Sequence, residues 1–159
     1  MTRSRTTPSA ATHPTRPTVS KPLHLHWRFI GLVALGGVLG TAAREGLSLA
    51  IPELGAFPWV IFGINVLGAL ILGFLTEALA RRGSDRGLRR VLRLGVGTGV
   101  MGGFTTYSTF AVGAAGLLEA DATGTAIAYG LATVVAGAVA TFAGILIGTL
   151  VHRRAEAAS

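Results

Sequence analysis

The chain has 159 residues, of which half are hydrophobic and only 13% are charged. Soluble domains carry about a quarter charged residues, so this composition indicates an integral membrane protein whose partner is the lipid bilayer. The absence of cysteine excludes disulfides and thiolate metal sites. The net charge of +7 does not indicate nucleic-acid binding, because the basic residues lie between apolar runs, where they mark a membrane surface.

Apolar runs predict the helices. Residues 1–27 are rich in Thr, Pro, Arg and Ser without an apolar period, which predicts a disordered tail. A cleaved signal peptide is the alternative, but no small-residue cleavage site follows the long basic lead. Residues 28–152 contain four apolar runs that each reach the ~20 residues of a spanning helix. We therefore predict an all-α membrane protein with four transmembrane helices at about residues 29–50, 55–80, 89–118 and 123–151, followed by a C-terminal tail at residues 153–159.

The distribution of charge predicts the orientation. Of the 14 Lys and Arg residues, all except Arg44 lie before the first helix, from the end of the second to the start of the third, or after the fourth. These positions share one side of a four-helix topology. The positive-inside rule therefore predicts a multi-pass protein of the cell membrane with both termini in the cytoplasm.

The third apolar run contains an unusual stretch at residues 102–110, Gly-Gly-Phe-Thr-Thr-Tyr-Ser-Thr-Phe. Glycine weakens a helix, and Ser and Thr can bond backbone groups that helix geometry would occupy. Backbone that leaves the helix at membrane depth is tolerated only where it is buried in protein or lines a wet cavity. We predict a break near residues 102–106 that coordinates an ion. A Gly/Thr helix-packing face is the alternative.

Other polar residues interrupt the apolar runs. Asn65, midway along the second run, can donate to an anion or be satisfied by a neighbouring helix. Arg44 is a surface anchor, a vestibule charge or the partner of Glu45. The fourth run carries polar groups spaced by four along one face, with a glycine as a gap: Tyr129, Thr133, Gly137 and Thr141. These hydroxyls either line a path or bond their own backbone.

Together these motifs resemble the Fluc (CrcB) family of fluoride channels. The resemblance covers roughly residues 29–152 and rests on Gly36-Gly37-Val38-Leu39-Gly40 leading to Arg44, on Asn65-Val66-Leu67-Gly68, and on the stretch 102–110. It implies passive fluoride export through two pores of an antiparallel dimer that traps a central sodium ion.

The resemblance also implies roles for individual residues. Sodium would be held by the main-chain carbonyls of Gly102 and Thr105, and Arg44 would lie at the vestibule. The fluoride pore would be lined by Asn65, Tyr107, Ser108, Thr109, Phe110, Tyr129, Thr133 and Thr141. The family usually has Phe at the position of Tyr107 and often a hydroxyl at the position of Gly137.

The strong charge bias bears on the partner subunit. A dual-topology homodimer needs each chain to insert both ways, which requires nearly balanced charge. We therefore hypothesise that this chain inserts in one orientation and pairs with an oppositely oriented homologous chain. A dual-topology homodimer is the alternative.

Two other functions fit the sequence less well. A small four-helix proton-coupled exporter needs a carboxylate at membrane depth, but Glu45, Glu77 and Glu119 lie toward helix ends. An enzyme is not expected, because the histidines lie in or near the tails and form no catalytic constellation. The sequence has no phosphate-binding Gly-x-x-x-x-Gly-Lys-Ser/Thr motif, which favours passive conduction over pumping.

Overall fold

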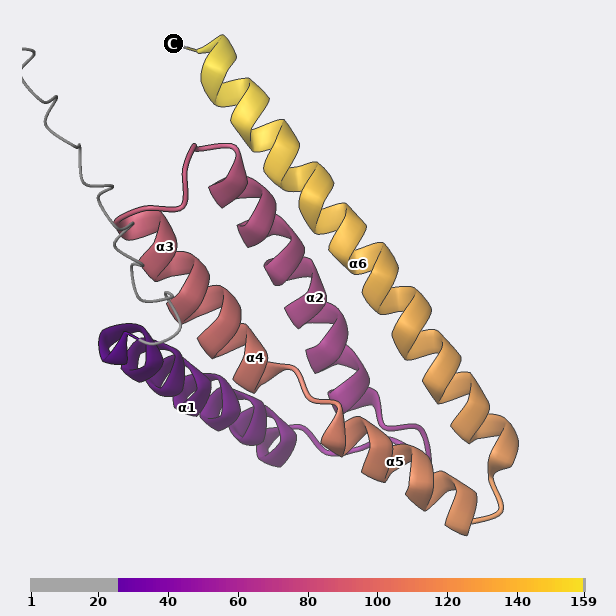
Figure 1. The fold of residues 1–159 in the computed structure, drawn as a ribbon. Helices are drawn as coiled ribbons and strands as arrows, with labels where there is room; N and C mark the ends of the chain where they lie inside the picture. Colours follow the sequence, from indigo (N-terminus) through magenta and orange to yellow (C-terminus); the bar gives the residue numbers. More distant parts are fainter. Residues whose placement is uncertain (1–25, 159) are drawn as a thin grey trace, which may run out of the picture.

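The computed structural model describes residues 26–158, and its regular structure there is entirely helical (Figure 1). The tail predicted at residues 1–27 lies outside the described residues, apart from His26 and from Trp27, which begins the first helix. The long helices are α1 (Trp27–Ala50), α2 (Trp59–Ala80) and α6 (Thr123–Ala157). Between α2 and α6 lie α3 (Leu88–Leu92), a π-helical segment (Arg93–Val100), α4 (Met101–Phe104) and α5 (Ser108–Glu119).

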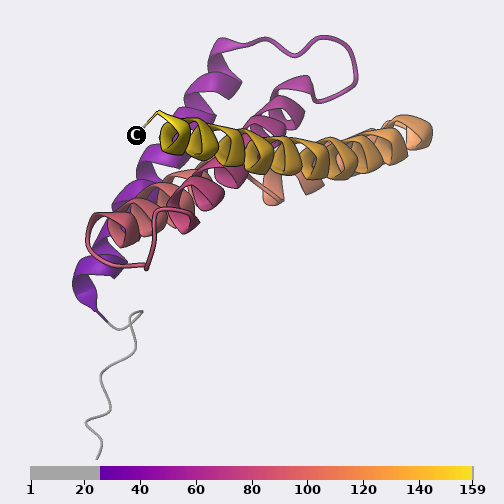
Figure 2. The same cartoon turned by 90° about the horizontal axis from the view of Figure 1, so that it is seen from above.

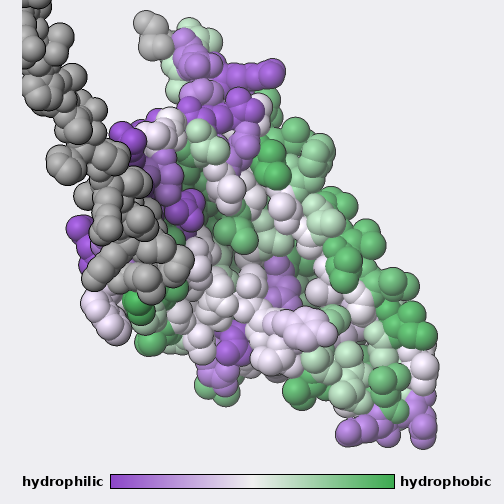
Figure 3. Space-filling model, viewed as in Figure 1, coloured by the Kyte–Doolittle hydropathy of each residue, from purple (hydrophilic) through white to green (hydrophobic). Residues whose placement is uncertain are grey.

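The surface of the molecule fits a membrane. The helices α1, α2 and α6 are each long and apolar enough to cross a bilayer. Large apolar side chains such as Val38, Val134 and Phe142 are exposed along them. Figure 3 shows hydrophilic residues toward the ends of the molecule and apolar residues between. Exposed apolar side chains along whole helices would cause aggregation in water, but they suit contact with lipid. The chain is therefore a membrane protein with several spanning helices.

Two helix ends differ from the prediction. The helix α2 begins at Trp59 rather than near residue 55, because Pro58 lacks the N–H that a preceding helical turn would need. The helix α6 runs through Ala157 rather than ending near residue 151, so most of the predicted C-terminal tail is helical. The alanines there favour helix, and His152 Nε2 lies 3.2 Å from Glu156 Oε1 one turn later.

Close backbone packing positions the segment that follows α3. The helix α1 lies against the π-helical segment and α4, while α2 lies against α6 (Figures 1 and 2). A Cβ atom placed on Gly36 or Gly40 would overlap the backbone of Gly95 or Val100, respectively. Without a hydrophobic drive between helices in lipid, such contacts supply the association. The two glycines therefore fix the distance of α1 from its neighbour.

Helical conformation stops at Phe104 and resumes at Ser108. Thr105 has φ −75° and ψ 151°, which is extended backbone. The interruption lies later than the predicted residues 102–106, because Gly102 and Gly103 are still helical and belong to α4. Gly103 has a packing role there, since a Cβ atom on it would overlap the carbonyl of Gly37. The helix thus stops at the hydroxyl residues rather than at the glycines.

Gly40→Ala tests this packing. The added methyl meets the main chain of Val100, which cannot move as a side-chain tip can, so we expect a loss of about 1–3 kcal/mol in the free energy of unfolding. The matched control is Gly37→Ala, whose methyl meets open space and removes a helical glycine. Thermal unfolding in detergent measures both variants. Equal losses would contradict the packing argument.

Candidate functional site

A cavity of about 360 Å³ lies beside the interrupted helix, between α2, α5 and α6. Its lining is Asn65, Thr105, Thr106, Tyr107, Phe110, Thr133, Val134 and Gly137. The cavity thus brings together Asn65, Tyr107, Phe110 and Thr133 from the predicted pore. The predicted pore residues outside its lining are Ser108, Thr109, Tyr129 and Thr141.

Asn65 is bonded to the interrupted backbone. Its Oδ1 accepts a hydrogen bond of 2.8 Å from the main-chain N–H of Thr106, and its Nδ2 donates one of 3.1 Å to the carbonyl of Thr106. Nearby, a Cβ atom on Gly68 would overlap the methyl group of Thr105. Asn65 and Gly68 lie one turn apart on α2, so this helix face receives the non-helical residues. Asn65 is therefore bonded by a neighbouring segment, which was one of the two possibilities that the sequence left open. One of its two amide protons remains without an acceptor in these bonds.

The hydrogen bonds of Asn65 leave the main-chain carbonyl of Gly102 without its usual helical donor. In a continuous helix the N–H of Thr106 would bond to the carbonyl of Gly102. Here that N–H donates to Asn65, while the N–H of Thr105 still reaches the carbonyl of Met101 at 3.0 Å. Gly102 is exposed, and the space where its side chain would lie is open. The Gly102 carbonyl is therefore deprived of its helical donor on an accessible face.

The hydroxyl of Thr106 begins the next helix. It accepts a hydrogen bond of 3.2 Å from the N–H of Thr109 in the first turn of α5, which satisfies an N–H that lacks an intrahelical partner. Thr106 Oγ1 also lies 3.2 Å from Ser108 Oγ and donates to Thr109 Oγ1 at 3.2 Å. Thr106 is a residue for which the sequence motifs predict no individual role. The sequence indicates only that the buried amide of Asn65 needs hydrogen-bond partners, and it does not indicate which residue provides them.

Arg44 reaches α5 from α1. Its Nη1 donates to Thr109 Oγ1 at 3.3 Å and lies 3.8 Å from Glu45 Oε2. Its side chain is 17% exposed, and its Nε has no hydrogen-bond partner among the described residues. Arg44 is thus tied both to Glu45, as one reading of the sequence allowed, and to the 102–110 stretch.

The row of hydroxyls on α6 is bonded to its own helix. Thr133 Oγ1 donates to the carbonyl of Tyr129 at 2.7 Å, and Thr141 Oγ1 donates to that of Gly137 at 2.9 Å. Each of these hydroxyls has only one proton, so neither offers a donor to an anion in this conformation. The open space at Gly137 adds room to the cavity rather than a polar group.

Aromatic rings form the wall of the site. Tyr107 and Phe110 lie with ring centroids 5.9 Å apart, and Phe110 lies 5.0 Å from Tyr129. Tyr129 is completely buried and also meets Phe57 edge-on, whereas Tyr107 is 81% exposed. Ring edges carry partial positive charge and can face an anion. Tyr107 is therefore free to contact a molecule outside this chain, and Tyr129 is not.

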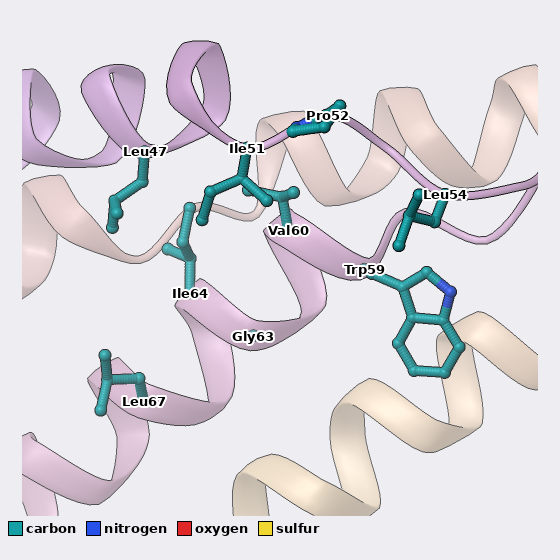
Figure 4. A pocket seen from close by; sticks show the side chains of 9 residues that line it. All are labelled: Leu47, Ile51, Pro52, Leu54, Trp59, Val60, Gly63, Ile64 and Leu67. Atoms are coloured by element: carbon teal, nitrogen blue, oxygen red, sulfur yellow. The ribbon is translucent and has the colours of Figure 1, made fainter.

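A second cavity has different chemistry. It encloses about 400 Å³ at the N-terminal end of α2, and its lining side chains are apolar apart from the indole N–H of Trp59. Figure 4 shows Ile51, Val60 and Ile64 converging on it from the connecting segment and from α2. Such a lining cannot replace the water shell of an ion. The cavity at Asn65, named the polar cavity here for the amide and hydroxyl groups in its lining, is the candidate anion site.

Charged residues gather at the α2–α3 connection rather than at the polar cavity. Arg89 on α3 donates to the carbonyls of Ser84 and Arg82 at 2.8 and 2.7 Å, which ties the connection to α3. Arg93 forms paired bonds to Asp85, and this contact lowers the pKa of the Asp85 carboxyl.

The described residues contain no cluster of His, Asp or Glu able to hold a metal ion.

Comparison with known proteins gives a consistent family. Residues 31–145 match the family described as CrcB-like protein, Camphor Resistance (CrcB). A protein of Leifsonia xyli subsp. xyli named Fluoride-specific ion channel FluC 2 is 52% identical over 135 residues, which cover 85% of this chain and 93% of that protein. Fluoride-specific ion channel FluC 1 of Cutibacterium acnes is 45% identical over 69% of this chain and 78% of its own length. The Fluoride-specific ion channel FluC of Novosphingobium aromaticivorans is 41% identical over 72% of this chain and 91% of its own length.

Proposed function

Because the chain belongs to the CrcB family, as its sequence motifs predicted, we propose that it is a fluoride channel, and not an enzyme, that lets fluoride leave the cytoplasm down its electrochemical gradient. One observation carries the proposal: the polar cavity combines the amide of Asn65 with the rings of Tyr107 and Phe110, and its lining includes no charged side chain. This combination provides donors for an anion without a full opposite charge.

The chemistry of fluoride fits this cavity. Fluoride is small and tightly hydrated, so a pore must replace its water with donors. The free Nδ2 proton of Asn65 and the ring edges of Tyr107 and Phe110 are such donors. Conduction also requires that the ion leave again, which a buried Lys or Arg would oppose. The hydroxyl of Tyr107 adds a donor that a Phe ring lacks.

The segment from α3 to α5 forms the fourth crossing, interrupted at residues 105–107. Its backbone at the interruption is bonded by Asn65 and by its own hydroxyls, which meets the requirement for irregular backbone in lipid. With α1, α2 and α6 this gives four spans. Both termini then lie on the basic, cytoplasmic side of the cell membrane.

The carbonyls of Gly102 and Thr105 would hold a sodium ion. The fit rests on the Gly102 carbonyl, which loses its helical donor to Asn65 and lies on an exposed face. Carbonyl oxygens replace the hydration shell of a monovalent cation without adding charge. When bound there, it would supply positive charge near the fluoride path and between the subunits. Asn65 and Thr106 contribute by keeping the Gly102 carbonyl free.

A second, oppositely oriented subunit completes the pores. Tyr107 is exposed beside the open cavity, and Gly102 is exposed as well, so a partner that covers this face would enclose two cavities, one from each subunit. The charge bias of the chain favours a homologous partner of opposite orientation over a second copy.

The proton-coupled alternative is not favoured by the structure. Glu77, the one carboxylate within α2, is paired with Arg81 and accepts a hydrogen bond of 3.1 Å from Thr149 Oγ1. Glu77 does not line the polar cavity. A coupling carboxylate has to reach the transported substrate, and this one is engaged elsewhere.

Fluoride efflux from proteoliposomes tests the function. We expect the wild type to release fluoride without a pH gradient, and Asn65→Ala and Phe110→Ile each to lower the rate by about tenfold or more, because each removes a donor worth about 1.4 kcal/mol. Phe142→Ile is the control, since this exposed ring on α6 lies outside the cavity. Efflux that requires a pH gradient would support the exporter. An inactive chain is retested with its homologue.

Sodium removal tests the cation site. Thermal unfolding in NaCl is compared with unfolding in N-methyl-D-glucamine chloride, and sodium at a hundred times its Kd should stabilise the protein by about 2.7 kcal/mol. Asn65→Ala returns the N–H of Thr106 to the Gly102 carbonyl, so the difference between the two salts should vanish in that variant. The same difference in both proteins would argue against the site.

Reporters at the C-terminus test the orientation. We expect signal from a cytoplasmic reporter and none from a periplasmic reporter, because basic residues dominate one side. A variant with the arginines at positions 81, 82 and 86 changed to Gln is the comparison, and a periplasmic signal should emerge there. Comparable signals from both reporters on the wild type would instead favour a dual-topology homodimer.

A further inference from the structure

We propose that Thr106 is a positioning residue that directs two hydrogen-bond donors, the amide of Asn65 and the hydroxyl of Thr109. The inference rests on the proposed channel function and deepens it, because it distinguishes hydroxyls that the sequence treats alike. It is carried by the bonds of the Thr106 main chain and those of its side chain, which act on different neighbours.

The main chain of Thr106 orients Asn65. The N–H of Thr106 donates to Oδ1 at 2.8 Å, and its carbonyl accepts from Nδ2 at 3.1 Å. A flipped amide would set two oxygens against each other and two N–H groups against each other, so both bonds select one orientation. The remaining Nδ2 proton is then the group left for an anion. Thr106 thereby determines that Asn65 offers a proton and not an oxygen.

The side chain of Thr106 determines which of the neighbouring hydroxyls donates and which accepts. A hydroxyl has one proton and two acceptor lone pairs. Thr106 Oγ1 gives its proton to Thr109 Oγ1 and accepts from the N–H of Thr109, both at 3.2 Å. Its second lone pair faces Ser108 Oγ, also at 3.2 Å, so Ser108 is the donor in that contact. The proton of Ser108 is thus committed to Thr106.

Thr109 is left as a donor. Its Oγ1 accepts from Thr106 on one side and from Arg44 Nη1 at 3.3 Å on the other, which fills both lone pairs. Its own proton has no hydrogen-bond acceptor among residues 26–158. The Arg44 charge polarises this hydroxyl and makes it a stronger donor. Of these three hydroxyls, Thr109 is therefore the one with a proton to offer to fluoride, from the Arg44 side of the site rather than from the lining of the cavity at Asn65, while Ser108 supports Thr106.

Thr106→Val tests the side-chain role, because it removes the hydroxyl but keeps the volume and the main-chain bonds to Asn65. We expect fluoride efflux to fall by about tenfold and Thr106→Ser to stay within about twofold of the wild type. Thr123→Val, the same change at an exposed position outside the site, is the control. If Thr106→Val is not monodisperse, Thr106→Ala takes its place. Equal efflux from the Val and Ser variants would overturn the proposal.

A double-mutant comparison separates positioning from general damage. If Thr106 acts through Thr109, Thr106→Val in a Thr109→Ala background should change efflux by less than about twofold, because the oriented proton is already gone. Losses that multiply would show that Thr106 acts independently and would refute its positioning role.

Hydrogen exchange gives a readout that does not depend on transport. The Thr109 N–H bonds to the Thr106 hydroxyl, so Thr106→Val should speed exchange at that amide by about tenfold, and Thr106→Ser should not. Unchanged exchange would overturn the proposal even in an active channel. A wild type without fluoride efflux both alone and together with its homologue would count against the channel function, while the exchange result would still decide whether Thr106 orders this turn.

Discussion

The paired hydrogen bonds between the side chain of Asn65 and the main chain of Thr106 are the interaction on which the rest of the site depends. A backbone that leaves the helix in an apolar environment exposes N–H and carbonyl groups that cost several kcal/mol each if they stay unpaired. Asn65 satisfies one of each at 2.8 and 3.1 Å. The interruption at residues 105–107 is therefore stable because Asn65 on α2 replaces hydrogen bonds that a continuous helix would have made.

This single exchange of partners has consequences on both sides of the segment. Toward α4 it withdraws the donor of the Gly102 carbonyl, which leaves an oxygen for the proposed sodium ion. Toward α5 it places the Thr106 hydroxyl where it can accept from the Thr109 N–H and start the next helix. The cation site and the anion path of the proposed channel thus share one structural cause.

Glycines set the distances between the helices that carry these hydrogen bonds. Contact of Gly36 and Gly40 with the π-helical segment sets the position of α1, and Arg44 on the same helix then reaches Thr109. On α2, Gly68 makes room for the methyl of Thr105 one turn from Asn65. Small residues therefore act here by allowing backbones to approach, and the polar residues complete the contact.

The sequence alone determined that the chain is a helical membrane protein of the CrcB family, because hydropathy, charge placement and motif spacing are local properties that survive without coordinates. It also identified Asn65, Tyr107, Phe110 and Thr133, which meet at one cavity. Only the tertiary structure decided that the interruption falls at Thr105 rather than at the glycines, that Thr133 and Thr141 bond their own helix, and that Thr106 is the partner of Asn65. Hydrogen bonds have direction and a limited number of donors, and which donor meets which acceptor depends on residues far apart in the chain, about which spacing says nothing.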